Sequence, residues 1–114
     1  MTNSVKLIGT FSVVCLDGEI DLHSSPEARK LILGCLQEGK STLVDLSSVI
    51  YIDSSGVASL VEGFQLARQR QLEFGLVGVS PAALNVLKLA RLDKVFPIYA
   101  SAQACLDKDQ DKTL

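Results

Sequence analysis

Short apolar, β-prone runs alternate along this chain with segments whose apolar residues recur at helical spacing. The first two runs are joined through Gly9-Thr10, Asp17-Gly18-Glu19 predicts a turn or bulge, and Ser47-Ser48 predicts a loop. The runs that predict strands cover residues 5–8, 12–16, 42–46, 49–52, 74–79 and 95–99. The chain therefore starts with a pair of strands before any helix is expected.

Two long helices are expected to follow. The first begins at Ser24-Ser25-Pro26-Glu27, where serine, proline and an acidic residue are typical of a helix N-terminus, and it ends at Gly39. The second begins directly after the run 49–52. The apolar face of the first consists of Ala28, Leu31, Ile32, Cys35 and Leu36, and that of the second of Val57, Leu60, Val61, Phe64 and Ala67.

Two shorter helices are expected near the C-terminus. One begins at Ser80-Pro81 and runs to about Arg91, and the other extends from Ser101 through Leu106. The helix after Pro81 is apolar on more than one face. Deep packing against a sheet is the favoured explanation, and an outer face that serves a partner or self-association is the alternative.

Alternation of strands and helices within 114 residues predicts one α/β domain with a largely parallel sheet covered by helices. The first pair of strands adds an antiparallel edge. We expect the domain to span residues 1–106, and residues 107–114 to form a flexible charged tail.

The most informative point in the sequence is the junction Asp53-Ser54-Ser55-Gly56, where a strand gives way to a helix. Free backbone N–H groups and the positive end of the helix dipole meet at such a point. This setting suits a phosphate, either bound or attached to a serine. Helix capping by Asp and Ser, with tight turning at Gly, explains the same residues without any function.

Composition excludes several classes of function. The net charge is −2, no tryptophan is present and no basic stripe occurs, so nucleic-acid binding is not expected. The three cysteines are widely spaced and His23 is the only histidine, so no metal site is expected. We expect the cysteines to act as small core residues in a reducing compartment. Without a signal peptide or a run of about 20 apolar residues, a cytoplasmic protein that does not insert into a membrane is expected.

An enzyme is not expected either. Asp21, His23 and Ser54 are the only residue types that could form a Ser-His-Asp set, and no G-x-S-x-G elbow is present. A Walker-type nucleotide motif is also missing. The sequence therefore predicts no catalytic residue and no cofactor.

Four segments together carry a family resemblance. Gly18-Glu19-Ile20-Asp21, Val44-Asp45-Leu46-Ser47, Ile52-Asp53-Ser54-Ser55-Gly56 and Gly78-Val79-Ser80-Pro81 resemble the STAS domain, the module of sulfate transporters and anti-sigma factor antagonists. The resemblance extends over residues 5–106. It implies a mixed β-sheet with helices packed mainly on one face.

The resemblance to the stand-alone antagonists implies a phosphorylation-controlled binding module. The serine that is phosphorylated in that group corresponds to Ser54, and Asp21 and Asp53 match the acidic positions that flank it. Ser55 and Gly56 would complete the partner-binding surface. The implied partner is an anti-sigma factor that is also the serine kinase, and a phosphatase resets the switch. The dephosphorylated form would bind that partner and free the sigma factor.

One departure leaves an alternative open. Antagonists often carry Gly-Leu-Gly after the serines, whereas Gly56-Val57-Ala58-Ser59-Leu60 stands here. That segment resembles the small cytoplasmic STAS subunits of lipid-transporting ABC complexes, which pack against the transporter ATPase.

Overall fold

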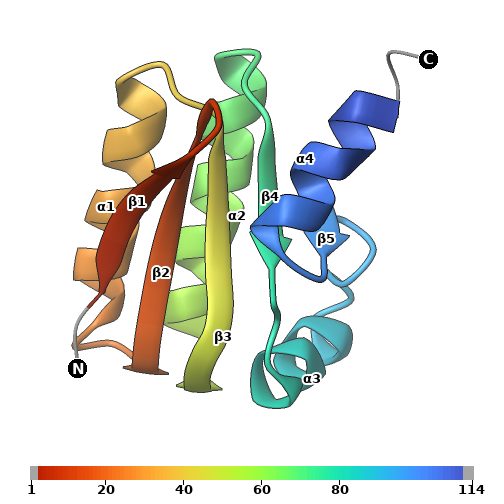
Figure 1. Cartoon of the computed structure of the whole chain (residues 1–114). Helices are drawn as coiled ribbons and strands as arrows, with labels where there is room; N and C mark the ends of the chain where they lie inside the picture. Colours follow the sequence, from red (N-terminus) through yellow and green to blue (C-terminus); the bar gives the residue numbers. More distant parts are fainter. Residues whose placement is uncertain (1–2, 112–114) are drawn as a thin grey trace.

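The computed structural model of the chain describes residues 3–111, with side chains as far as Asp107. Within that range five strands form one sheet in the order β1-β2-β3-β4-β5 (Figure 1). β1 is antiparallel to β2, and the remaining neighbours are parallel. The elements are β1 (Ser4–Ile8), β2 (Phe11–Ile20), α1 (Ser25–Gln37), β3 (Thr42–Ile52), α2 (Ser54–Gln69), β4 (Phe74–Val77), α3 (Pro81–Leu89), β5 (Ile98–Tyr99) and α4 (Ala102–Asp111).

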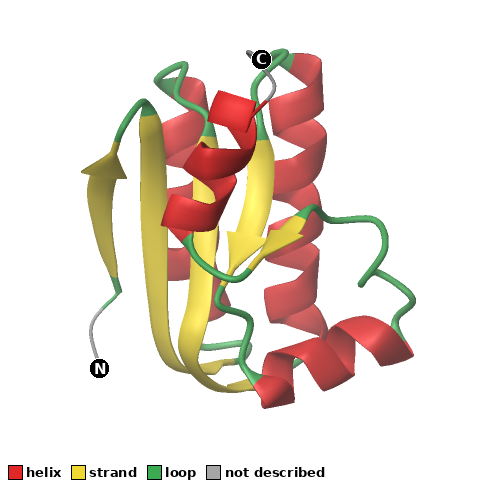
Figure 2. Ribbon diagram, turned by 45° about the vertical axis from the view of Figure 1, so that its right-hand side comes forward, coloured by secondary structure: helices red, strands yellow, loops and turns green. Residues whose placement is uncertain are grey.

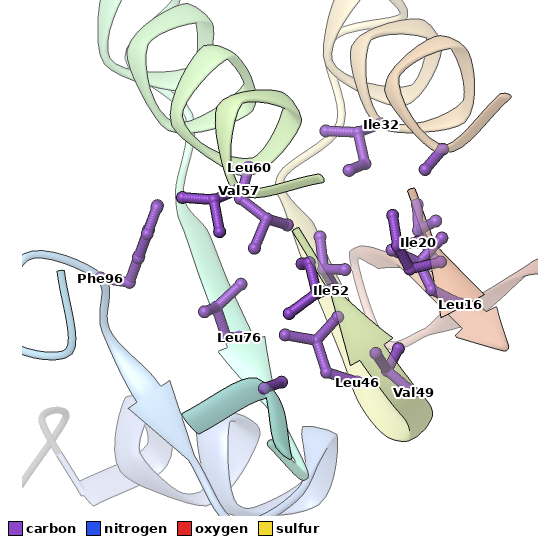
Figure 3. Close-up of a cluster of buried hydrophobic side chains, with 14 of the residues drawn as sticks. Leu16, Ile20, Ile32, Leu46, Val49, Ile52, Val57, Leu60, Leu76 and Phe96 are labelled. Carbon is purple, nitrogen blue, oxygen red and sulfur yellow. The ribbon is translucent and has the colours of Figure 1, made fainter. Parts of the chain in front are cut away.

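The helices are unevenly distributed over the sheet. α1 and α2 cover one face, α4 lies on the other, and α3 sits below the ends of β3 and β4 (Figures 1 and 2). The main hydrophobic core fills the space between the sheet and α1 and α2 (Figure 3). A smaller core under α4 contains Phe11, Val13, Leu43, Val77 and Cys105. The predicted mixed sheet with helices mainly on one face is confirmed.

The central strands are apolar on both sides because both faces of the sheet are covered. In β3, Leu43 points into the core under α4, whereas Val44 and Leu46 belong to the main core. Val13 and Val14 divide in the same way in β2. This two-sided burial is the reason that parallel strands appear in the sequence as short continuous apolar runs.

The loop predicted at Ser47-Ser48 is wrong, because β3 continues without a break to Ile52. β2 also extends to Ile20 and follows β3 through two register shifts, one on each side of Gly18 and Asp17. The bulge predicted there is therefore confirmed, and the positive φ of Gly18, 79°, suits it. Because of these register shifts, β2 and β3 remain paired up to their carboxyl ends, although both contain polar residues.

Two elements near the C-terminus differ from prediction. The last strand covers only Ile98–Tyr99, because Phe96 turns into the main core and packs edge-on against Phe64, with ring centroids 5.5 Å apart. α4 continues to Asp111, five residues past Leu106, so helix occupies most of the segment expected to be a flexible tail. The rest of that tail, residues 112–114, lies outside the described residues.

The favoured interpretation of α3 as a deeply packed helix is wrong. Only Ala83 and Leu87 are buried, and Leu89 is 83% exposed. The predicted serine cap is confirmed, since the Ser80 hydroxyl oxygen accepts a hydrogen bond from the Ala83 N–H at 3.3 Å. The same hydroxyl donates to the Val49 carbonyl at 2.7 Å, which ties α3 to β3.

We predict that Ser80→Ala lowers the free energy of unfolding by about 1–2 kcal/mol, because it removes a cap and leaves the Val49 carbonyl without its donor. Ser101→Ala is the matched control, because the Ser101 hydroxyl caps only the Ala104 N–H. Urea unfolding should show a clearly smaller loss for Ser101→Ala. Equal losses would mean that the bond to Val49 contributes nothing.

Candidate functional site

The site is built where two neighbouring parallel strands end. Ile20 of β2 pairs with Ile52 of β3, and each isoleucine is followed directly by an aspartate. The Asp53 N–H donates to the Ile20 carbonyl at 3.1 Å, so the two strand ends are tied together one residue beyond the ladder. The structure therefore brings the Asp21 turn and the Asp53 junction side by side. The two lie far apart in the sequence, so the sequence alone does not indicate this contact.

Asp53 caps α2 with both backbone and side-chain contacts. Its Oδ1 accepts hydrogen bonds from the Ser55 N–H at 2.9 Å, the Gly56 N–H at 3.3 Å and the Ser55 hydroxyl at 2.5 Å. The hydrogen bond from the Ser55 hydroxyl, together with those backbone donors, lowers the pKa of Asp53 below its ordinary value of 3.8. The junction therefore holds a carboxylate that is ionised at neutral pH.

The two serines of the junction differ in what their hydroxyls do. Ser55 is half-buried and its hydroxyl is engaged by Asp53. Ser54, the first residue of α2, is exposed, and no hydrogen bond of its hydroxyl is found among residues 3–111. Of the two, Ser54 is the hydroxyl that an incoming group can reach.

Asp21 is held in a tight turn before α1. Its Oδ1 accepts hydrogen bonds from the N–H groups of His23 at 2.9 Å and Ser24 at 3.1 Å, and these donors, Ser24 first, lower the pKa of Asp21. Ser24 occupies the predicted cap position, but its hydroxyl donates back to the Glu19 carbonyl at 2.6 Å instead of capping α1. Among the described residues, the hydrogen bond found for His23 is that of its backbone N–H, and none joins its ring to Ser54.

Gly56, predicted as part of the partner-binding surface, is buried. A Cβ at this position would lie 2.6 Å from a side-chain carbon of Ile52 and 2.8 Å from one of Ile20. Gly56 therefore lets the first turn of α2 approach the ends of both strands, and its role is packing beneath the site.

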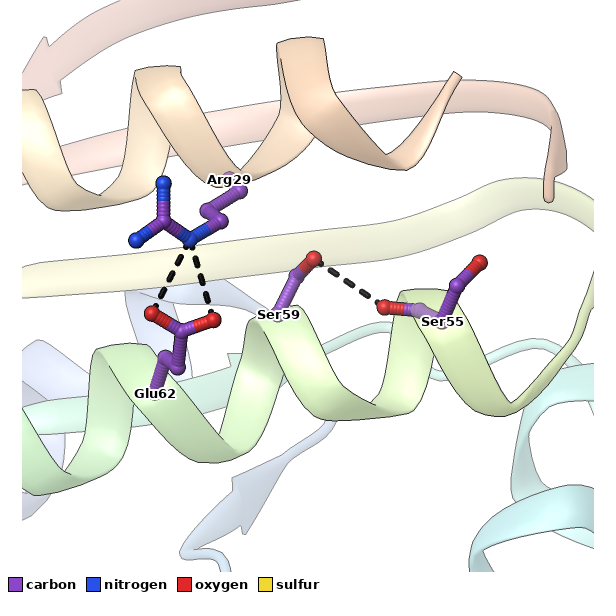
Figure 4. A network of polar contacts seen from close by, with 4 residues as sticks. All are labelled: Arg29, Ser55, Ser59 and Glu62. Atoms are coloured by element: carbon purple, nitrogen blue, oxygen red, sulfur yellow. Dashed lines mark hydrogen bonds and ion pairs between the residues drawn. The ribbon is translucent and has the colours of Figure 1, made fainter. Parts of the chain in front are cut away.

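A polar strip between α1 and α2 adjoins the junction and was not foreseen from the sequence. The Arg29 Nε donates to both carboxylate oxygens of Glu62 at 2.9 Å, and the buried Ser59 hydroxyl donates to the Ser55 carbonyl at 3.1 Å (Figure 4). With Ala58 and neighbouring residues, these side chains line a shallow groove of about 390 Å³. Arg29 and Glu62 meet only because α1 packs against α2, so no local sequence pattern predicts this ion pair.

The remaining chemistry of the chain is sparse. Cys35 and Cys105 are buried in the two cores, as predicted, and burial raises the pKa of the Cys35 thiol. No group of three or more His, Cys, Asp or Glu side chains that could hold a metal ion occurs between residues 3 and 111. In the same part of the chain, no helix has the length and apolar character needed to cross a membrane.

We predict that Gly56→Ala lowers the free energy of unfolding by about 1–3 kcal/mol, because the added methyl group overpacks the contact with Ile20 and Ile52. Gly34→Ala is the matched control, since a Cβ in the middle of α1 would meet nothing within 4 Å. Thermal or urea unfolding measures both. If Gly56→Ala were as stable as Gly34→Ala, the close approach would not constrain the helix.

The Asp53 cap also predicts a pH dependence. A carboxyl group with a lowered pKa in the folded protein stabilises the fold above its ordinary pKa of 3.8, and this contribution is lost as the pH falls through the lower folded value. Asp53→Asn should therefore be less stable than the wild type at neutral pH, and the gap should close in acid. Urea unfolding along a pH series measures the gap; a gap that is constant with pH would contradict the ionised cap.

Comparison with known proteins places this geometry in a family. The STAS domain family model matches residues 4–105. The anti-sigma-B factor antagonist of Listeria monocytogenes is 32% identical over 82 residues, which cover 71% of this chain and 72% of that protein.

Solved structures agree with the sequence comparison. An anti-sigma factor antagonist from Mycobacterium paratuberculosis has a TM-score of 0.81 and 28% identity, with 94% of this chain and 92% of that chain covered. The unphosphorylated form of the anti-sigma factor antagonist SpoIIAA superposes with a TM-score of 0.78 and 18% identity, with 96% of this chain and 97% of that chain covered. The phosphorylated form of the Bacillus cell fate determinant SpoIIAA superposes with a TM-score of 0.74 and 19% identity, with 94% of this chain and 98% of that chain covered. The chain belongs to the STAS domain family.

Proposed function

We propose that this chain is an anti-sigma factor antagonist that is switched by phosphorylation of Ser54. In its dephosphorylated form it binds an anti-sigma factor and frees the sigma factor. The observation that carries the proposal is the Ser54 hydroxyl, exposed at the N-terminus of α2 beside the carboxylate of Asp53. The relatives named above are anti-sigma factor antagonists, which supports the same function.

A phosphate on Ser54 would change the surface more than the fold. The side chain points to solvent, and the N-terminal end of a helix favours negative charge. The nearby carboxylates of Asp53 and Asp21 are already ionised, so a phosphate of about −1.5 to −2 charge would make this surface strongly negative. A partner that covers Ser54 would then have to desolvate that charge, and binding would weaken.

Exposed apolar side chains beside the two aspartates support a protein-binding role. Leu22 follows Asp21 and is 75% exposed, and Ile50 and Tyr51, close before Asp53, are 68% and 50% exposed. These apolar side chains provide contact area beside Ser54. We expect a partner to bury that area only while Ser54 carries no phosphate.

The cycle that we propose has three components. The anti-sigma factor is itself the serine kinase that modifies Ser54, a phosphatase removes the phosphate, and both act in the cytoplasm. The chain binds and is modified, and it catalyses no reaction. Asp21, Asp53 and Ser55 shape the surface around Ser54, with Gly56 supporting it from below.

The departure from Gly-Leu-Gly after the serines does not require the transporter alternative. Val57 is buried in the main core, where an apolar residue is needed, and Ala58 lies at the edge of the groove between α1 and α2. The antagonists among the relatives and structures favour a sigma-factor pathway over an ABC-transporter subunit.

We predict that incubation with the cognate kinase and ATP places one phosphate on Ser54, because its hydroxyl alone at the junction is free and exposed. Mass spectrometry of the digested protein locates the phosphate. Ser54→Ala should abolish the modification, whereas the matched control Ser55→Ala should still be phosphorylated. Phosphate on Ser55 alone would remove Ser54 from the role.

A variant that mimics the phosphate distinguishes a switch from a helix cap. Ser54→Asp should bind the anti-sigma factor at least about tenfold more weakly than the wild type, as expected if binding must desolvate an added charge. Its melting temperature should remain close to that of the wild type. A large fall in melting temperature with unchanged affinity would instead assign Ser54 to capping only.

A further inference from the structure

A second face of the molecule, away from Ser54, carries an open apolar groove. It lies between the edge strand β1 and the outer side of α1, has a volume of about 480 Å³, and is lined by Val5, Glu27, Lys30, Leu31, Gly34, Cys35 and Glu38. β1 and α1 together form one lateral side of the molecule (Figures 1 and 2). Because β1 pairs only with β2, its other edge is not covered by a described strand.

The floor of the groove is apolar although it faces solvent. Val5 is 43% exposed, and Leu31 is half-buried against the main core. Leu7 lies two residues along β1, on the same face of the strand as Val5, and is 63% exposed. Exposed apolar residues that gather along a sheet edge and a helix are typical of an interaction surface.

Gly34 has no internal reason to be glycine. It lies in the interior of α1, where glycine is less favourable than alanine, its φ angle is not positive, and a Cβ would meet nothing within 4 Å. Its missing side chain instead leaves a flat place in the wall of the groove, at which the backbone of another element can approach closely.

Charges flank Gly34 symmetrically. Lys30 lies four residues before it and Glu38 four residues after it, so both share its side of α1; both are exposed and line the groove. If a second α1 packs antiparallel with the two Gly34 residues opposite each other, each Lys30 faces Glu38 of the other copy. Glu27 and its counterpart lie beyond these pairs, toward the N-terminal ends.

We infer that the β1–α1 groove is a homodimer interface, in which two copies pack α1 against α1 antiparallel about a two-fold axis at Gly34. The same surface then serves both copies, as a closed dimer requires. Two Lys30–Glu38 ion pairs set the register, and Val5 and Leu31 supply the apolar contact. α1 lies between this groove and α2, and Ser54 is the first residue of α2, so the dimer leaves both Ser54 side chains accessible.

Sedimentation equilibrium tests the interface without any partner. The wild type should show a reversible monomer–dimer equilibrium between about 1 µM and 1 mM, the range of weak to moderate protein association. Lys30→Glu and Glu38→Lys should each weaken the dimer about tenfold, because each places like charges opposite one another twice. The double variant Lys30→Glu/Glu38→Lys should restore it.

Two further variants separate interface effects from loss of folding. Gly34→Arg should remain folded by circular dichroism, because the position is open, and it should be monomeric. Lys88→Glu, an equal charge change on α3, should dimerise as the wild type does. A wild type that stays monomeric at all concentrations, a double variant as weak as the single ones, or a dimeric Gly34→Arg would overturn the interface, and none of these results bears on Ser54.

Discussion

The close contact between the first turn of α2 and the ends of β2 and β3 is the constraint on which the rest of the site depends. Gly56 leaves no room for a side chain between the helix and Ile20 and Ile52. The hydrogen bond from Asp53 to the Ile20 carbonyl closes the same contact through the backbone. With the helix fixed in this place, Asp53 can cap it, Ser55 is occupied, and Ser54 is left pointing outward.

This arrangement separates the residues that hold the fold from the residue that we propose is phosphorylated. Gly56, Val57 and the isoleucines lie inside and hold the geometry, whereas the Ser54 side chain is exposed and its hydroxyl makes no hydrogen bond among the described residues. A charge added at Ser54 therefore acts at the surface.

Sequence alone predicted the parts of the structure that depend on local pattern. The antiparallel first pair, the parallel strands, the amphipathic α1 and α2 and the Ser80 cap all follow from spacing and from residues with strong positional preferences. The sequence pattern gave wrong predictions where packing between distant segments determines the structure. β3 continues through Ser47-Ser48 because β2 bulges and stays paired with it. α3 is apolar in sequence, yet most of its side chains are exposed. The junction was recognisable from Asp53-Ser54-Ser55-Gly56, but the adjacency of Asp21, the engagement of Ser55 and the Arg29–Glu62 pair arise only once strands and helices pack together.

Amide hydrogen exchange, measured together with partner binding on the phosphorylated and unphosphorylated chains, tests the central claim most directly. The account predicts that phosphate on Ser54 leaves protection in β2, β3 and the body of α2 unchanged while affinity for the anti-sigma factor falls. Faster exchange throughout β3 and α2 on phosphorylation would contradict it, because the charge would then act by loosening the fold.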